Sequence, residues 1–269
     1  MSKFFVKTEQ IKNNNIIING DDVNHIINVL RMKKGDELQI CNQETGDNYN
    51  AQITQYTKDE VDCEIIEKIN KTTESNVHIT LFQGLPKFEK MELIIQKNTE
   101  VGVSKIVPVI MERTVVKIDE KVASKKLERW QKIAEIAAKQ SMRDIIPKID
   151  NIIKLKDTDI TNFDAVLVAY ENEEHNKLKD ELQKLKQKLK SNSSNNSSKD
   201  NTEDTLQYNI AIVIGPEGGI AEKEIEMLAE KNARFVSLGK RILRTETAGM
   251  TVLSILMYQL EENWNPGRR

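Results

Sequence analysis

The sequence predicts an α/β protein in which a small β-rich domain precedes a larger domain with a parallel sheet flanked by helices. Two observations support this division. Short apolar runs broken by Gly or Asp fill the first seventy residues, whereas apolar strands alternate with helix-length amphipathic stretches from residue 77 onward. The polar stretch 70–76 lies between the two patterns and lacks long apolar side chains. We therefore expect domains at 1–72 and 73–269.

The first domain is read as a set of short strands with one helix. Apolar side chains recur at helical spacing over 23–30, where Asp21 or Asp22 can cap a helix. Four apolar runs predict strands, at 16–18, 37–41, 49–55 and 61–69.

The second domain alternates β and α segments, which is typical of a mostly parallel sheet. Its strands at 165–169 and 210–214 are nearly continuous apolar runs, which indicates a sheet covered on both faces. The predicted strands are 77–83, 105–110, 163–170, 208–215 and 234–239, and the predicted helices are 87–101, 125–141, 222–231 and 246–262.

One stretch belongs to neither pattern. Residues 177–190 are rich in Lys and are read as a solvated helix face and tether, in preference to an RNA-binding arm. Residues 191–205 are rich in Ser and Asn and are expected to form a disordered surface insertion.

Charge and composition exclude several classes of protein. The 269 residues carry 40 Lys and Arg against 42 Asp and Glu, so no chain-wide cationic field attracts nucleic acid. Two Cys and three scattered His do not suggest a disulfide framework or a metal site. No apolar run reaches the length of a membrane span, and the N-terminus turns polar at once. We expect a cytoplasmic protein without metal or membrane contact.

The most informative motif is the loop GPEGG at 215–219, which follows an apolar strand and precedes a helix. Its glycines allow a ligand to approach the backbone closely. It matches neither phosphate-binding fingerprint, and its Glu would lie beside any phosphate, so a cationic or neutral ligand fits better. Taken alone, the motif would be read as an ordinary tight turn.

A second loop, at 237–245, also follows a predicted strand and precedes a helix. Since ligands of open α/β sheets bind beyond the carboxyl ends of the strands, the two loops are expected to wall one crevice. Leu238, Ile242 and Leu243 supply apolar surface there. Thr245 is a natural helix cap, and the helix dipole favours Glu246 in the first turn.

Six sequence blocks together resemble the RsmE family of the SPOUT-superfamily methyltransferases. They are KFFV at 3–6, HIINVLR at 25–31, LPKFEKMELIIQKNTEVGV at 85–103, RWQKIAEIAAKQSMR at 129–143, IGPEGGI at 214–220 and LGKRILRTETA at 238–248. Lys3, Asn24, Val101, Lys139 and Ala221 depart from the family's usual Arg, His, Leu, Glu and Ser. These departures leave the fold intact and blur the assignment of RNA contacts.

The resemblance implies methylation of N3 of a uridine in bacterial 16S ribosomal RNA, with S-adenosylmethionine as the methyl donor. It also implies a PUA-like β-barrel that engages RNA, a SPOUT sheet with a trefoil knot, and a homodimer. The residues expected to contact the cofactor are Gly215, Pro216, Glu217, Gly218, Gly219, Leu238, Gly239, Ile242, Leu243, Arg244 and Thr245.

RNA contacts and catalytic groups are also expected. Arg244 is the first candidate for stabilising the uracil anion, and Glu246 or Glu217 is the alternative as proton acceptor. The residues expected to contact 16S ribosomal RNA or the small subunit are Lys3, Phe4, Arg31, Lys87, Lys90, Lys97, Arg113 and Arg143.

Three other functions remain open from the sequence. A SPOUT enzyme can instead methylate a ribose 2′-hydroxyl, and the protein can be a non-catalytic RNA-binding assembly factor. A nucleotide-dependent dehydrogenase or NTPase is disfavoured because its phosphate fingerprint is absent.

Overall fold

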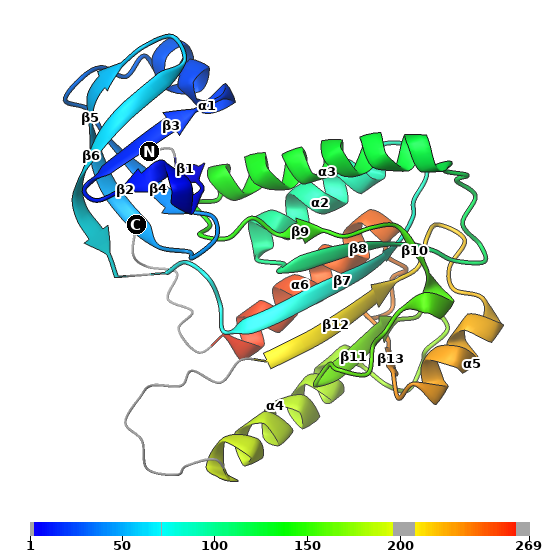
Figure 1. The fold of residues 1–269 in the computed structure, drawn as a ribbon. Helices are drawn as coiled ribbons and strands as arrows, with labels where there is room; N and C mark the ends of the chain where they lie inside the picture. Colours follow the sequence, from blue (N-terminus) through cyan, green and yellow to red (C-terminus); the bar gives the residue numbers. More distant parts are fainter. Residues whose placement is uncertain (1–2, 71, 196–207, 262–269) are drawn as a thin grey trace. The chain divides into compact units, whose positions relative to one another are not determined.

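The computed structural model describes residues 3–70, 72–195 and 208–261 (Figure 1). The chain divides into two units, residues 1–74 with 135–146 and residues 75–134 with 147–269. No feature of the sequence indicated that 135–146 belongs with the first unit. The expected domain limits, 1–72 and 73–269, stay a proposal.

The first unit is a curled six-stranded sheet with the order β1-β4-β5-β6-β3-β2. Strand β1 pairs in parallel with β4, and the other pairs are antiparallel. The strands are β1 (Lys3–Val6), β2 (Ile11–Lys12), β3 (Asn15–Asn19), β4 (Glu37–Asn42), β5 (Asn48–Tyr56) and β6 (Glu60–Ile69). Four of them confirm the predicted strands. The short helix α1 (Asp21–Asn24) continues as one wide helical turn, η2 (His25–Val29), and η1 (Thr8–Gln10) is a single 3₁₀ turn.

Buried charges attach residues 135–146 to this sheet. The Lys3 ammonium binds the Asp144 carboxylate, and Arg143 Nη2 lies 2.5 Å from Glu74 Oε2. Burial acts to raise the pKa of the Asp144 carboxyl, but hydrogen bonds from Lys3 and Thr73 outweigh it and hold that pKa below its usual value. A buried charge is stable only when it is paired, so these residues form one network.

The second unit is a sheet of parallel strands, which confirms the predicted α/β architecture. Its order is β10-β8-β7-β12-β11-β13, with β9 paired to β8. The strands are β7 (Val77–Gly84), β8 (Lys105–Ile110), β9 (Lys148–Ile149), β10 (Ile153–Lys154), β11 (Ala165–Ala169), β12 (Tyr208–Ile214) and β13 (Arg234–Val236). Because β12 lies between β7 and β11, segments distant in the sequence end side by side. The trefoil knot, which the resemblance alone implied, stays a prediction.

Helices cover both faces of this sheet (Figure 1). Side chains of α2 and α6 pack together, and α5 packs against the cluster that contains Ala211 and Val213 of β12. The helices are α2 (Lys90–Val101), α3 (Glu120–Gln140), α4 (Leu178–Asn195), α5 (Glu222–Glu230) and α6 (Thr245–Leu260), and η3 (Leu155–Asp157) is a single 3₁₀ turn. The last residues of α3, from 135 onward, belong to the first unit.

Helix α4 corrects the reading of the lysine-rich stretch. Leu178, Leu182 and Leu185 are buried, so the helix has an apolar face that belongs to this unit and is not a tether. Residues 191–195, expected to be disordered, continue the helix, and 196–205 lie outside the described residues. The apolar residues recur at helical spacing, a signal that the many lysines obscured.

Candidate active site

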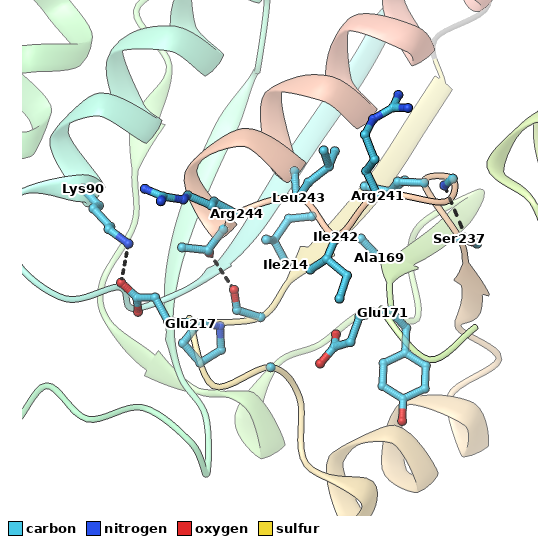
Figure 2. Close-up of a pocket in the computed structure, with 18 residues that line it drawn as sticks. Lys90, Ala169, Glu171, Ile214, Glu217, Ser237, Arg241, Ile242, Leu243 and Arg244 are labelled. Carbon is cyan, nitrogen blue, oxygen red and sulfur yellow. Dashed lines mark hydrogen bonds and ion pairs between the residues drawn. The ribbon is translucent and has the colours of Figure 1, made fainter. Parts of the chain in front are cut away.

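Four strands of the second unit end at one edge of the sheet, and a pocket of about 470 Å³ opens there (Figure 2). The strands β11, β12 and β13 send the segments 169–171, 214–219 and 237–245 into its wall. Lys90, just beyond the loop that follows β7, completes the wall. The location agrees with the general rule for ligand sites in open α/β sheets.

The loop at 215–219 is tied to its surroundings by its glutamate. The carboxylate of Glu217 accepts a hydrogen bond from the Lys87 backbone N–H at 3.1 Å, and Lys90 Nζ lies 3.0 Å from Glu217 Oε1. Desolvation acts to raise the pKa of Glu217, but these hydrogen bonds outweigh it and lower that pKa. The same contact raises the pKa of Lys90. Glu217 is thus an ionised structural anchor, and we find no support for it as a proton acceptor.

Glycines permit close approaches on both sides of this loop. A Cβ at Gly84, the last residue of β7, would lie 2.6 Å from the backbone nitrogen of Pro216. Gly219 has a φ of +73°, and a Cβ there would lie 2.2 Å from Glu171 Oε1. A side chain at Gly84 would displace the backbone of Pro216, whereas one at Gly219 would push the Glu171 carboxylate aside and hold a left-handed backbone that favours glycine.

Thr245 joins the two predicted loops directly. Its hydroxyl donates a hydrogen bond to the carbonyl of Gly215 at 2.7 Å and accepts one from Gln83 Nε2 at 2.9 Å. The prediction of Thr245 as helix cap is wrong, because the cap is Arg244 and no side chain bonds there. The hydroxyl instead satisfies buried backbone at the base of the pocket.

The loop at 237–244 supplies the apolar wall. Leu238 and Leu243 line the cavity together with Ile214 of β12. Ile242 also lines it while 85% exposed (Figure 2). A large aliphatic side chain this exposed in a pocket wall is suited to be covered by a bound molecule.

The predicted cofactor residues converge on this pocket. All of them except Gly218 line it; Gly218 lies just outside, where its carbonyl accepts a hydrogen bond from Arg113 Nη1 at 3.0 Å. The contribution of β11 was missed, namely Ala169, Tyr170 and Glu171. The strand-end rule applied to the predicted strand at 163–170 makes these residues candidates for a ligand site. Only the sheet order, with β11 beside β12, shows that they reach the same pocket.

Arg244 and Glu246 form a charged rim with Lys90. Lys90 Nζ lies 3.4 Å from Glu246 Oε2, and Arg244 Nη1 lies 3.9 Å from Glu246 Oε1. The Glu246 side chain is 14% exposed, whereas that of Arg244 is 83% exposed. Glu246 is therefore held between two cations, and Arg244 is the member of this group that a large substrate can reach.

Three predicted RNA contacts are buried in the first unit. Lys3 and Arg143 belong to the buried charge network described above, and Phe4 is 1% exposed in the core. These three predictions are wrong, since neither charge nor ring faces solvent. Arg31, Lys87 and Arg113 are exposed. Lys90 and Lys97 are half-buried and bind Glu217 and Glu100.

The chemistry of the pocket suits a molecule with an apolar or aromatic part and a polar part. Its aliphatic wall can grip a ring, its glycine-rich floor can approach the ligand closely, and Glu171 offers a carboxylate to hydroxyl or cationic groups. Among the described residues, no three His, Cys, Asp or Glu side chains gather as a metal centre requires. No helix in the described part of the chain has both the length and the apolar character needed to cross a membrane.

Comparison with family models gives two matches. The model of the RNA methyltransferase domain matches residues 73–257, and the model of the RNA methyltransferase PUA domain matches residues 18–66. The first of these covers more than half of the chain.

The chain is also similar to curated proteins named Ribosomal RNA small subunit methyltransferase E. That of Bacillus subtilis is 37% identical over 246 residues, which cover 91% of this chain and 90% of the relative. That of Aquifex aeolicus is 32% identical over 93% of this chain and 97% of the relative.

Among solved structures, the Neisseria gonorrhoeae methyltransferase of the same name, bound to S-adenosyl methionine, has a TM-score of 0.77. It is 28% identical, with coverage of 97% of this chain and 98% of that one. These findings confirm the resemblance inferred from the six sequence blocks. The chain belongs to the family of the ribosomal RNA small subunit methyltransferases E.

Proposed function

We propose that this protein transfers the methyl group of S-adenosylmethionine to N3 of a uridine in small-subunit (16S) ribosomal RNA. The observation that carries the proposal is the pocket at the strand ends, whose wall comes largely from two of the six sequence blocks that resemble the family. A relative that is similar over nearly the whole chain binds S-adenosyl methionine.

The residues present fit this cofactor. Leu238, Ile242 and Leu243 would hold an adenine ring, and Gly215 and Gly219 leave room for the ligand beside the backbone. Glu171 would accept hydrogen bonds from the ligand's hydroxyl or ammonium groups. When bound, the cofactor supplies an electrophilic methyl group on a sulfonium.

The protein must stabilise the charge that develops on the uracil base when its N3 is methylated. Uracil N3 carries a proton at neutral pH, so attack requires stabilisation of the negative charge that develops on the base. Arg244 is exposed at the pocket rim and can donate to a uracil oxygen. Glu246, 3.9 Å from Arg244 and largely buried, acts as a positioning residue for that guanidinium. Holding two reactants in line supplies the rest of the rate enhancement.

The RNA must present the base outside a helix, because N3 of a paired uridine is occupied by hydrogen bonding. Exposed cations of the second unit, Lys87 and Arg113, would contact the phosphates. Arg31 would do so from the first unit, for which we propose the RNA-binding role. This substrate would place the protein in the cytoplasm, where ribosomes are assembled.

We further propose a homodimer. Helix α6 begins at the pocket and exposes Ile255 and Tyr258, with 37% and 64% of their surface accessible. Exposed apolar side chains on a helix that bounds the site suit contact with a second copy. Light scattering of the purified protein at micromolar concentration should give twice the mass of one chain. The mass of a single chain at micromolar concentration would contradict the dimer.

The function is tested by nucleoside mass spectrometry. Small ribosomal subunits from a strain without this protein are incubated with purified protein and S-adenosylmethionine, and the rRNA is digested to nucleosides. N3-methyluridine that depends on both additions supports the proposal. A 2′-O-methylated nucleoside would move the acceptor to the ribose. Binding of subunits without cofactor binding or methylation would identify an assembly factor instead.

Arg244 is tested separately. With saturating cofactor, Arg244→Ala should lower the single-turnover methylation rate about 100-fold, the usual loss when one donor to a developing anion is removed. Lys240, a cation exposed on the same turn that does not line the pocket, provides the control. Lys240→Ala should retain most of the rate. A near-normal rate for Arg244→Ala, measured under the same conditions, would exclude the catalytic role.

A further inference from the structure

We infer that Phe88 and the small pocket behind it form a stacking site for an unpaired RNA base that flanks the target nucleotide. The inference rests on the proposed function, because it names how the same active site holds its RNA. The site lies in the segment between β7 and α2 and uses none of the residues assigned to the cofactor.

The backbone and exposure of Phe88 are both unusual. Its side chain is 87% exposed, the highest value among the exposed large apolar residues of the described chain. Its φ is +56°, in the left-handed region where a bulky side chain is a genuine outlier. An exposed aromatic ring and a strained backbone both disfavour folding, and such strain clusters where a ligand is clamped. A role for the ring outside the folded core accounts for both.

A pocket of about 260 Å³ adjoins the ring. Its apolar lining comprises Leu85, Pro86, Met91, Val116, Ile118 and Trp130. Trp130 is 3% exposed and fixed by packing, and the Lys126 ammonium lies 5.8 Å from the centre of its ring. An apolar recess beside an exposed aromatic ring provides surface on which a base can stack.

Charged groups around the recess suit a nucleotide. Lys126 and Arg129 lie in its wall, and Arg129 also pairs with Glu92 at 2.8 Å across α3 and α2. Glu89 is the second carboxylate of the wall. Lys87, next to Phe88, is exposed, and its ammonium has no acidic partner among the residues the structure describes. The rim thus offers a cation for the phosphate of the stacked nucleotide.

Continuity with the active site identifies the occupant as RNA. The Lys87 N–H donates to Glu217 of the cofactor pocket, so Phe88 follows the residue that fastens the glycine-rich loop. Two residues further on, Lys90 lines that pocket itself. When the target base of an RNA enters the cofactor pocket, a neighbouring base of the same RNA would therefore lie beside Phe88.

The test measures RNA binding, methylation of subunits and cofactor binding in parallel for three variants at this position. Phe88→Ala removes the ring, Phe88→Tyr keeps it, and Phe88→Gly removes both the ring and the backbone strain. Val122→Ala truncates another exposed apolar side chain of the second unit, outside the recess, as a control. Small subunits from a strain without the protein serve as substrate, and the same rRNA stripped of protein serves as a binding probe.

For Phe88→Ala and Phe88→Gly we expect roughly 5- to 150-fold weaker binding of subunits and of stripped rRNA, the usual cost of one lost base stack. Phe88→Tyr and Val122→Ala should match the unchanged protein, and cofactor binding should be the same in all. Phe88→Gly should also melt no lower than the unchanged protein, which a structural role for the ring would not allow.

Unchanged RNA binding by Phe88→Ala, in a protein that methylates subunits normally, would overturn the inference and leave the proposed function intact. Weaker binding of subunits with normal binding of stripped rRNA would also overturn it, because the ring would then contact a ribosomal protein. Failure of the unchanged protein to methylate any subunit is a separate result, which removes the proposed function itself.

Discussion

The two loops that wall the cofactor pocket are held in opposite ways. Loop 215–219 is fastened on every side, by Glu217 to Lys87 and Lys90, by the carbonyl of Gly218 to Arg113, and by the carbonyl of Gly215 to Thr245. For 238–243, the one hydrogen bond found among the described residues runs from the Gly239 N–H to Ser237 Oγ, at 3.4 Å.

The difference separates a preformed part of the site from an adaptable one. The fastened loop fixes the backbone geometry of the pocket before any ligand binds, so its residues contribute mainly to stability. The loosely held loop exposes Ile242, which gains contacts only when a molecule fills the pocket. Mutations in the first loop should therefore change folding, and mutations in the second should change binding.

The largest effect is expected at the edge of the fastened loop. In Gly84→Ala the new Cβ would overlap the backbone of Pro216, so the free energy of unfolding should fall by about 2–3 kcal/mol. Gly249 in α6 provides the matched control, since a Cβ there would lie 3.5 Å from Leu81. Gly249→Ala should raise the free energy of unfolding by about 0.5–1 kcal/mol, because alanine favours the helix. Denaturant titration measures the free energy of unfolding of both variants. Equal values for the two would contradict the conclusion that loop 215–219 is rigidly held.

A smaller effect is expected in the loosely held loop. Ile242→Ala should leave the free energy of unfolding within about 0.5 kcal/mol, since the side chain is largely exposed. The dissociation constant for S-adenosylmethionine should rise about 5-fold, because partial burial of this side chain is worth about 1 kcal/mol. Titration calorimetry measures this dissociation constant. Val115→Ala, which truncates another exposed aliphatic side chain, is the control. Unchanged affinity with lost stability would reverse the assignment of the two loops.

The smallest effect concerns the anchor carboxylate. Because the folded pKa of Glu217 is lowered, its ion pair stabilises the protein fully above the ordinary pKa of 4.5, and this stabilisation is lost as pH falls through the folded pKa. At pH 7, Glu217→Gln should cost about 0.5–1 kcal/mol, since the pair is partly exposed. The difference from the unchanged protein should shrink below pH 4.5. Glu226→Gln, an exposed position of α5, should show neither effect. A cost at pH 7 that persists unchanged in acid would rule out the charge as its cause.

Much of the site could be predicted because its parts are local. Glycine-rich turns after apolar strands, at 215–219 and 237–245, identify strand ends that face a ligand whatever surrounds them. The site predictions that failed concern side chains that the fold buries against distant partners. Lys3 and Arg143 looked like RNA contacts because they are cationic, but each is buried against an acid distant in the sequence. Thr245 looked like a helix cap, but its hydroxyl bonds a carbonyl thirty positions away.

By itself, the sequence determined the α/β class, most of the strands and helices of both units, the family, and the two loops of the pocket. Hydrophobic period and turn residues act over a few neighbours, which is why these features could be read locally. Only the tertiary structure decided that 135–146 joins the first unit, that β11 supplies Glu171 to the pocket, and which cations are buried. These depend on which distant segments lie side by side, and pairing between buried charges or neighbouring strands leaves no local pattern in the chain. Phe88 shows the same limit, because its exposure and left-handed backbone become visible only once the fold places it beside Trp130.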